Sequence, residues 1–437
     1  MNRAYGTHRD LLTDISYDPF MGLYLSSAQN RKANPTLGTS PDENYAREVM
    51  QLFSCGVYAY DQYGQFTYDT NGDRLENYDN EDITELARVF TGLGLSVVKG
   101  VLDDFDSPTL NRSGRYLHPM LMSEPHHDQG SKVLLDGTII PAGQGGDDDI
   151  TQALDTLALH PSTAPFISRQ LIKRLTSSNP SAAYIGRVVE AWNGNGTYGQ
   201  GNVGDFGSVI KAILLDTEAR NAVNYTVTDG VVSTHPTRVA SARICEPILK
   251  WTQFYRFSQA LSGEADGWVR VKAKTKRSGS DETPNFGQIP MRAPSVFNYY
   301  DTDYSPAVGD LAEAEEELGI NLVSPESEIL SPYVIHQFEA FLRIANQDIP
   351  YSSHNFNGNV SQPTSITYNY LRYLYEKNSR VEDFIDDVNL WFCKGQISPT
   401  LRQTLSSLAN STGGATRENF AKIITVIFNS SDFSVIY

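Results

Sequence analysis

Cysteine is scarce in this sequence, whose 437 residues contain only Cys55, Cys245 and Cys393. The three are far apart and odd in number, so the chain has no CxxC pair for a metal or redox reaction, and we do not expect a disulfide framework. Uninterrupted apolar runs of about 18 residues are also missing, so we expect no membrane-spanning helix.

Positive charge is in the minority, with 35 Lys and Arg against 52 Asp and Glu and a net charge of −17. Nucleic acids and anionic membranes favour a basic surface, so neither is expected as the main partner. Apolar residues make up 40% of the chain and aromatics 11%, with 24 Tyr and 19 Phe. This is enough to build a core and excludes a disordered chain. The opening residues, MNRAYGTHRDLL, lack the basic and apolar segments of a signal peptide.

Apolar residues recur at helical spacing along most of the chain, which predicts a mainly α fold: a multi-helix globular body with long irregular loops and a few short strands or hairpins. No long linker is visible, so we expect residues 1–437 to form a single large helical unit. Loop-rich insertions are expected at 57–80, 93–148 and 262–330. Helices are expected near 11–25, 40–54, 82–90, 149–160, 161–178, 180–192, 205–220, 237–261, 332–346, 363–377, 381–393, 398–410 and 416–429.

Several strings occur together and in order: PDENYAREVMQLFSCGV, YDNEDITELARVFTGL, HHDQGSKVLL, APSVFNYYDTDYSP and NFAKIITVIFNSSDFSVIY. In this combination the chain resembles the bacterial family called domain of unknown function 1800, from about residue 10 to the C-terminus. The resemblance implies an exported protein (periplasmic, cell-surface or extracellular) and a longer N-terminal part before the matching region. It also implies a genomic neighbour that resembles sulfatases and alkaline phosphatases. It implies no established activity.

Glu43, Arg47 and Glu48 form the first candidate catalytic group. Glu43 and Arg47 are four residues apart, so they share one face of a helix, and Glu48 lies about 100° further round. An arginine between carboxylates can orient a carboxylate or phosphate of a ligand. The alternative is structural, with Ser40 and Glu43 forming a capping box at the start of the helix.

A second candidate group lies around His126 and His127. The family pattern His-Asp-x-Gly-x-Lys selects His127, Asp128 and Lys132. Imidazole and carboxylate side chains can bind a transition metal or act as a general base, although no standard zinc motif is present. The structural alternative is a polar loop held onto the helices by hydrogen bonds.

Asp69, Asn71 and Asp73 occupy positions 1, 3 and 5 of a calcium-loop pattern, which predicts a calcium site. The glycine expected at position 6 is Arg74, however, and an acidic turn before the next helix is the alternative. Similarly, Asp148 or Asp149 is expected to cap the helix that follows.

Tyrosines concentrate in predicted loops such as VYAYDQYGQFTYD, where they suit protein interfaces, carbohydrate binding or core packing. Two functional hypotheses follow. The first is a non-catalytic extracellular or surface assembly component that presents Tyr-rich loops to a protein partner or to copies of itself. The second is an exported, metal-assisted hydrolytic enzyme or enzyme subunit that acts on an extracellular polymer. The second requires the helix of Glu43 and the loop of His127 to share a pocket.

Overall fold

A computed structural model describes residues 6–106 and 116–220 without a break. Beyond residue 220 it describes 226–228, 231–233, 243–257, 275–277, 280–282, 287–288, 293–307, 312, 322–331, 334, 349–351, 364–366, 381–393, 395, 397–410 and 417–436. The chain divides into two compact units, Met1–Ser233 and Thr234–Tyr437. Whether 1–437 packs as one helical unit stays a prediction. The fold is mainly α, as the sequence predicts.

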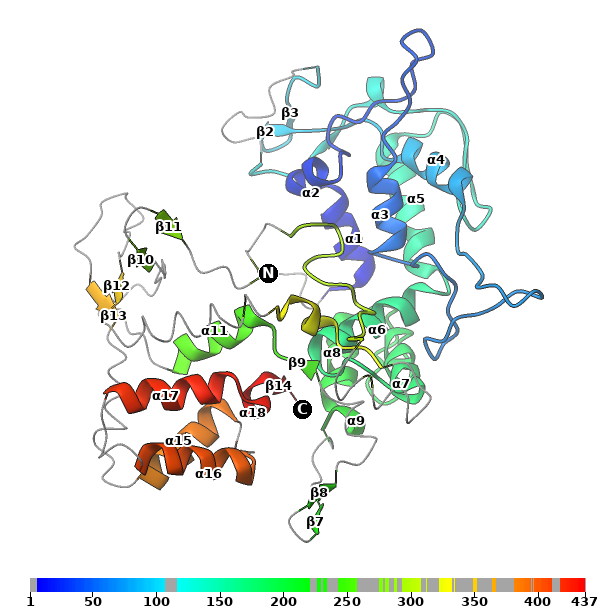
Figure 1. Ribbon diagram of the computed structural model, residues 1–437. Helices are drawn as coiled ribbons and strands as arrows, with labels where there is room; N and C mark the ends of the chain where they lie inside the picture. The colour runs from blue at the N-terminus through cyan, green and yellow to red at the C-terminus, as the bar shows by residue number, and fades with distance from the viewer. Residues whose placement is uncertain are drawn as a thin grey trace. The chain divides into compact units, whose positions relative to one another are not determined.

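The first unit is built of helices joined by long loops (Figure 1). Its helices are α1 (His8–Ser16), α2 (Pro19–Tyr24), α3 (Asn44–Gln51), α4 (Asn80–Val89), α5 (Gly146–Leu159), α6 (Thr163–Leu175), α7 (Ala182–Trp192), α8 (Phe206–Leu215) and α9 (Thr217–Arg220). Its short strands pair antiparallel: β1 (Leu93–Gly94) with β4 (Leu121–Met122), β2 (Ser96–Val98) with β3 (Val101–Leu102), β5 (Lys132–Val133) with β6 (Ile139–Ile140), and β7 (Thr226–Thr228) with β8 (Val231–Ser233).

Two groups of helices bury the apolar faces that the sequence periodicity predicts. Helices α6, α7 and α8 pack around Tyr184, Trp192 and Ile213, which are all fully buried. Helices α3, α4 and α5 pack together through a second set of buried apolar residues that includes Val49, Leu86 and Leu154. Because α4 contacts both α3 and β5, it joins the two segments in which the sequence places candidate site residues.

Helix α3 begins three residues later than the sequence predicts, and the capping box of Ser40 and Glu43 is wrong. Its N-cap is Glu43, whose side chain makes no capping hydrogen bond. The Asn30 side chain donates to the carbonyl of Asp42 at 3.0 Å and accepts from its amide at 2.9 Å. These two bonds keep the residues before α3 outside the helix, and the Asp42 carboxylate accepts from the amide of Asn44 instead.

The expected cap of α5 by Asp148 or Asp149 is also wrong. The N-cap is Gly145, and Glu124 Oε1 accepts from the amide of Gly146 at 3.0 Å. Glu124 belongs to a short 3₁₀ turn, Glu124–His126, so a distant segment supplies the carboxylate that the first turn attracts. Asp149 lies inside the helix and points toward the core, four residues before Ala153 and eight before Leu157.

The second unit has its core among C-terminal helices: α15 (Val381–Phe392), α16 (Pro399–Asn410), α17 (Arg417–Phe428) and α18 (Ser431–Ser434). Phe384, Leu405 and Ile427 are fully buried there. Strand β9 (Arg243–Ile244) pairs with β14 (Val435–Ile436) and leads into α11 (Pro247–Phe257). The helix expected at 237–261 is therefore wrong at residues 243–246, and its two ends, 237–242 and 258–261, lie outside the described residues. The remaining described elements are β10 (Thr275–Arg277), β11 (Ser280–Glu282), η3 (Pro325–Ile329), β12 (Ile349–Tyr351) and β13 (Thr364–Ile366).

The helices expected at 381–393, 398–410 and 416–429 are confirmed to within about one residue at each end. Most of the expected helix 332–346 lies outside the described residues, as does most of 363–377. The start of the latter is a strand, β13, paired antiparallel with β12. In α11, burial lowers the pKa of Lys250 to about 8, and its ammonium donates to the Phe428 carbonyl at the end of α17.

Candidate functional site

His127 is fully enclosed, with none of its side chain exposed. Its Nδ1 lies 2.9 Å from the carbonyl oxygen of Thr91, just after α4. Its Nε2 lies 3.1 Å from Oδ2 of Asp149 in α5. Both ring nitrogens are therefore held by protein acceptors, one from each of the helical segments that flank the loop.

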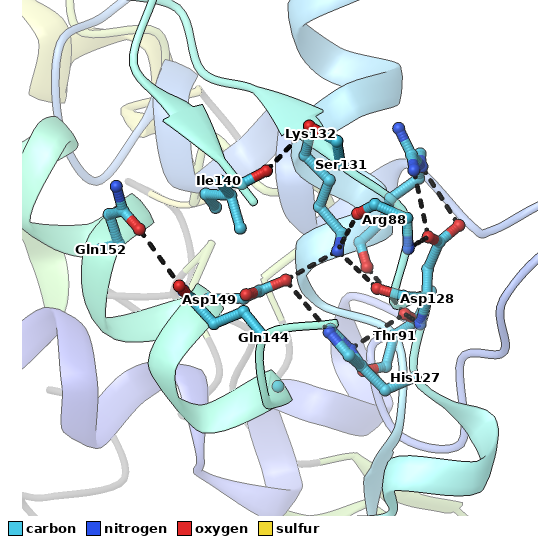
Figure 2. A network of polar contacts seen from close by, with 12 residues as sticks. Arg88, Thr91, His127, Asp128, Ser131, Lys132, Ile140, Gln144, Asp149 and Gln152 are labelled. Atoms are coloured by element: carbon cyan, nitrogen blue, oxygen red, sulfur yellow. Dashed lines mark hydrogen bonds and ion pairs between the residues drawn. The ribbon is translucent and has the colours of Figure 1, made fainter. Parts of the chain in front are cut away.

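Lys132 points at the same Asp149 oxygen from β5 (Figure 2). Its Nζ lies 2.7 Å from Oδ2 of Asp149 and 3.0 Å from the carbonyl of Gly130, and it also donates to the carbonyl of Asp128. An ammonium group has three N–H donors, so these contacts use all of them. Lys132 and the Asp149 side chain are 1% and 0% exposed, which makes this a buried ion pair with few routes to solvent.

Asp128 faces away from this pair and binds Arg88 of α4. The guanidinium makes two bonds to the carboxylate, with Nε–Oδ2 3.1 Å and Nη2–Oδ1 3.0 Å, and its Nη1 binds Glu85 one turn earlier. Burial raises the pKa of Asp128, but hydrogen bonds from Arg88 and Gly130 outweigh it and place that pKa below its ordinary value. Glu85 in turn accepts from the amide of Val133 at 3.0 Å, so β5 is tied to α4.

The sequence finds three members of this network, His127, Asp128 and Lys132, and misses Arg88 and Asp149. A signal for Asp149 exists, because its helical spacing with Ala153 and Leu157 places it on an apolar face. As arranged, the network holds the loop against α4 and α5, and a substrate has no access to its imidazole. Across the described residues, no group of three or more His, Cys, Asp or Glu is placed to hold a metal ion.

Glu43, Arg47 and Glu48 lie in or next to α3, with different surroundings. Glu43 binds Arg47 at 3.4 Å and accepts from the hydroxyl of Thr84 in α4 at 3.0 Å, and both of its partners are partly exposed. Glu48 is 6% exposed, and its Oε2 has no hydrogen-bond partner in the part of the chain that the structure describes. Burial raises the pKa of Glu48 above its ordinary value, and the charge of Arg47 partly offsets this.

The helix of Glu43 and the loop of His127 do not both line the groove that the structure describes. A groove at the surface of the first unit is lined by Glu43, but His127, Asp128 and Lys132 are not among its lining residues. Helix α4 connects the segments through Thr84 and Arg88. The described contacts between these segments are therefore packing and hydrogen bonds through α4. The shared site that the enzyme hypothesis requires stays a prediction.

The predicted calcium loop is the tip of a β-hairpin. Oδ1 of Asp69 accepts from the amides of Asn71 and Asp73, both at 2.9 Å, and Oδ2 accepts from the Asn71 side chain at 3.2 Å. The hydrogen bond from the Asp73 amide is the largest of the effects that lower the pKa of Asp69. Calcium binding stays a prediction, and an ion would have to replace these hydrogen bonds.

Residues 57–77, which we call the aromatic arm, form three extended segments that pair with one another. Ala59 donates its amide to Leu75 at 2.8 Å, Leu75 donates to Thr67 at 3.0 Å, and Thr67 donates to Ala59 at 2.9 Å, which closes a triangle. The hairpin or extended loop expected here is thus confirmed. Three two-stranded pairs radiate from this triangle: a base, a branch that turns at 61–65, and a tip at 68–74.

The base of the aromatic arm is fixed by Asn77. Its Nδ2 lies within 3.0 Å of the carbonyls of Cys55, Gly56 and Tyr58, and its Oδ1 accepts from the hydroxyl of Ser162 at the start of α6. The branch is fixed against α7, where a Cβ on Gly186 would come within 2.7 Å of the Tyr63 ring. A glycine at this position therefore lets the ring lie directly on the helix.

The tip of the aromatic arm projects from the helices of the first unit, as the blue loop between α3 and α4 (Figure 1). Tyr68 is 57% exposed and Leu75 is 43% exposed. The guanidinium of Arg74 lies 3.9 Å from the centre of the Phe66 ring, and Phe66 lies 4.8 Å from the ring of Tyr60. An ordered stack of rings thus supports Tyr68, which is exposed beside a polar turn at residues 69–74.

A family model described as "Protein of unknown function (DUF1800)" matches residues 1–435. The chain belongs to this family. No curated protein and no solved structure matches it. The family resemblance of the sequence is therefore confirmed over almost the whole chain, and any activity of this DUF1800 protein has to be argued from its own residues.

The DUF1800 match also covers both candidate groups, so the strings around Glu43 and around His127 belong to the family's region. In this DUF1800 chain each of the three polar side chains of the second string is bound to α4, to α5 or to its own loop. The described residues contain no helix long and apolar enough to cross a membrane.

Proposed function

We propose that this protein is a non-catalytic, exported assembly component of the cell surface or extracellular space, and that it contacts copies of itself through the tip of the aromatic arm. The observation that carries this proposal is a firmly anchored arm that exposes Tyr68 in its tip and Leu75 where the tip begins. Tyrosine is enriched at protein interfaces, since it offers a large apolar ring and a hydrogen-bonding hydroxyl.

The anchoring of the arm favours binding. A loop that is ordered before it meets its partner loses less conformational entropy on association than a flexible one. Here the Asn77 hydrogen bonds fix the base, and the Arg74–Phe66–Tyr60 stack supports the tip. Export is part of the proposal because members of this family are expected outside the cytoplasm.

The net charge of −17 sets how this association responds to salt. Two copies repel each other over the whole surface, and salt screens that repulsion over a distance of about 10 Å at 0.1 M and about 3 Å at 1 M. An apolar contact survives this screening. We therefore expect association to strengthen as salt rises, which is opposite to the behaviour of a contact made by salt bridges.

Sedimentation velocity of the full chain at rising NaCl concentration tests the proposal. We expect the wild-type protein to form larger species as salt rises, and the Tyr68→Ser/Leu75→Ser variant to stay monomeric. Leu37→Ser is the matched control, because Leu37 is a 74% exposed apolar residue outside the arm. A monomeric wild type at all salt concentrations, or association that the arm variant retains, would overturn the proposal.

A further inference from the structure

A polar groove opens on the first unit between the loop after α2 and the segment that leads into α3. Its volume is about 650 Å³, within the range of about 300–1,000 Å³ that is usual for small-molecule sites. Its polar lining includes Ser26, Gln29, Arg31, Thr39, Asp42 and Glu43, and Ser40 lies beside Thr39. The aromatic arm contributes no residue to it, so it is a separate feature of the molecule.

The walls of the groove are held in fixed positions. The Asn30 side chain bonds both the amide and the carbonyl of Asp42, which joins the two walls. Ser26 and Gln29 both have φ of 62°, a left-handed conformation that is unfavourable for residues with a side chain. The Gln29 amide donates to the Leu93 carbonyl at 2.7 Å, which helps to hold this conformation.

Several polar atoms of the groove have no partner within the described residues. They are the hydroxyls of Ser26, Thr39 and Ser40, the amide oxygen of Gln29 and Oδ2 of Asp42. Hydroxyl groups both donate and accept hydrogen bonds, while the two remaining oxygens only accept. The set is complementary to a ligand that carries several hydroxyl groups, each able to donate to one atom and accept from another.

The charged groups of the groove are largely neutralised by the protein itself. Arg31 binds Asp106 at 2.6 Å and the carbonyl of Phe105 at 3.3 Å. Glu43 is bound by Arg47 and by the hydroxyl of Thr84. An anionic ligand would meet Asp42 and Glu43 without an uncommitted cation, so the charges disfavour an anion. The hydroxyls of a neutral ligand can donate to Asp42 without any charge of their own.

We propose that this groove binds a neutral oligosaccharide, whose hydroxyls donate to Gln29 Oε1 and Asp42 Oδ2 and exchange hydrogen bonds with Thr39 and Ser40. The site binds without a chemical step. It goes beyond the proposed assembly role and does not depend on it, because arm and groove share no residue.

Isothermal titration calorimetry of the full chain with maltotetraose, cellotetraose and tetra-N-acetylchitotetraose tests this proposal. We expect saturable binding of at least one of the three. The Thr39→Val/Ser40→Ala variant removes two hydroxyls at exposed positions, so it should fold normally and bind about thirty-fold more weakly, from two lost hydrogen bonds.

The matched control is Thr404→Val/Ser431→Ala, which removes two exposed hydroxyls from the second unit and should leave the affinity unchanged. Tetragalacturonate tests the charge argument and should not bind. The proposal is overturned if none of the neutral tetrasaccharides binds, if only tetragalacturonate binds, or if the groove variant binds as tightly as the wild type. Sugar binding should persist in Tyr68→Ser/Leu75→Ser, so failure of one proposal does not imply failure of the other.

Discussion

At the scale of single residues, the buried pair of Lys132 and Asp149 favours a structural role for the His127 loop. A buried ion pair is costly to form, but removing one partner leaves the other charge buried and uncompensated, at a cost of about 3–5 kcal/mol. Here the ammonium has three acceptors and the carboxylate oxygen is shared with His127. The loop therefore has a defined position only while all three groups are present.

We predict that Lys132→Met lowers the free energy of unfolding of the first unit by about 3–5 kcal/mol. Asp155→Asn is the control, because Asp155 makes a more exposed ion pair with Arg9, and its loss should cost about 1 kcal/mol or less. Urea unfolding followed by circular dichroism gives both values, and hydrogen exchange in α4 and α5 shows where the loss occurs. Equal effects of the two substitutions would contradict a structural role for Lys132.

Glu48 provides a test that depends on pH. Burial raises its pKa in the folded state, so the folded protein holds this proton more tightly than the unfolded chain does. The stability it contributes is fully present below the unfolded pKa of about 4.3 and is lost as pH rises through the folded pKa. The Glu48→Gln variant does not undergo this loss. Its free energy of unfolding relative to that of the wild type should therefore increase between pH 4 and pH 7. Urea unfolding across that range measures the difference, and a constant difference would contradict the burial argument.

At the scale of elements, the Asn77 side chain holds the base of the aromatic arm in position. Its side chain satisfies backbone carbonyls that would otherwise lose their partners, and each unsatisfied buried group costs about 1–3 kcal/mol. We predict that Asn77→Ala speeds hydrogen exchange throughout residues 57–77 and destabilises the first unit by about 1–3 kcal/mol. Asn71→Ala, at the exposed end of the same arm, should change only the tip. Equal exchange in the two variants would mean that Asn77 does not anchor the arm.

Helices were the part of this structure that the sequence predicted well, because their signal is local. Ile83, Leu86, Ala87 and Phe90 repeat at helical spacing and are buried in or directly after α4 as expected. The failures came from long-range contacts. Asn30 keeps Asp42 out of α3, and Glu124 takes the capping position of α5, so neither helix start follows from its own residues.

In the candidate site, too, local signals were predicted and long-range contacts were not. The sequence found His127, Asp128 and Lys132 as a group, since they are close in the chain, but it could not show that they point to different partners. Asp149 lies 22 residues after His127 and Arg88 lies 40 before Asp128, and only folding brings them together. The groove was not predicted, because its walls meet through the side chain of Asn30, which carries no motif.

At the scale of the whole molecule, the described residues place His127 and Lys132 differently from the side chains of the two proposed binding features. His127 and Lys132 are buried, whereas Tyr68 and Leu75 of the arm and Thr39 and Ser40 of the groove are exposed. This distribution suits a protein that binds and assembles. It also separates the two binding features, so each can be removed without the other.

Site-specific cross-linking tests the central claim, contact between copies through the arm, most directly. A photoreactive benzoyl-phenylalanine in place of Thr70, within the tip, should give cross-linked dimers of the full chain on illumination, and more of them at high salt than at low salt. The same group in place of Thr404, an exposed residue of α16 outside the arm, should give few. Dimers from position 404 alone, or from neither position, would contradict assembly through the aromatic arm.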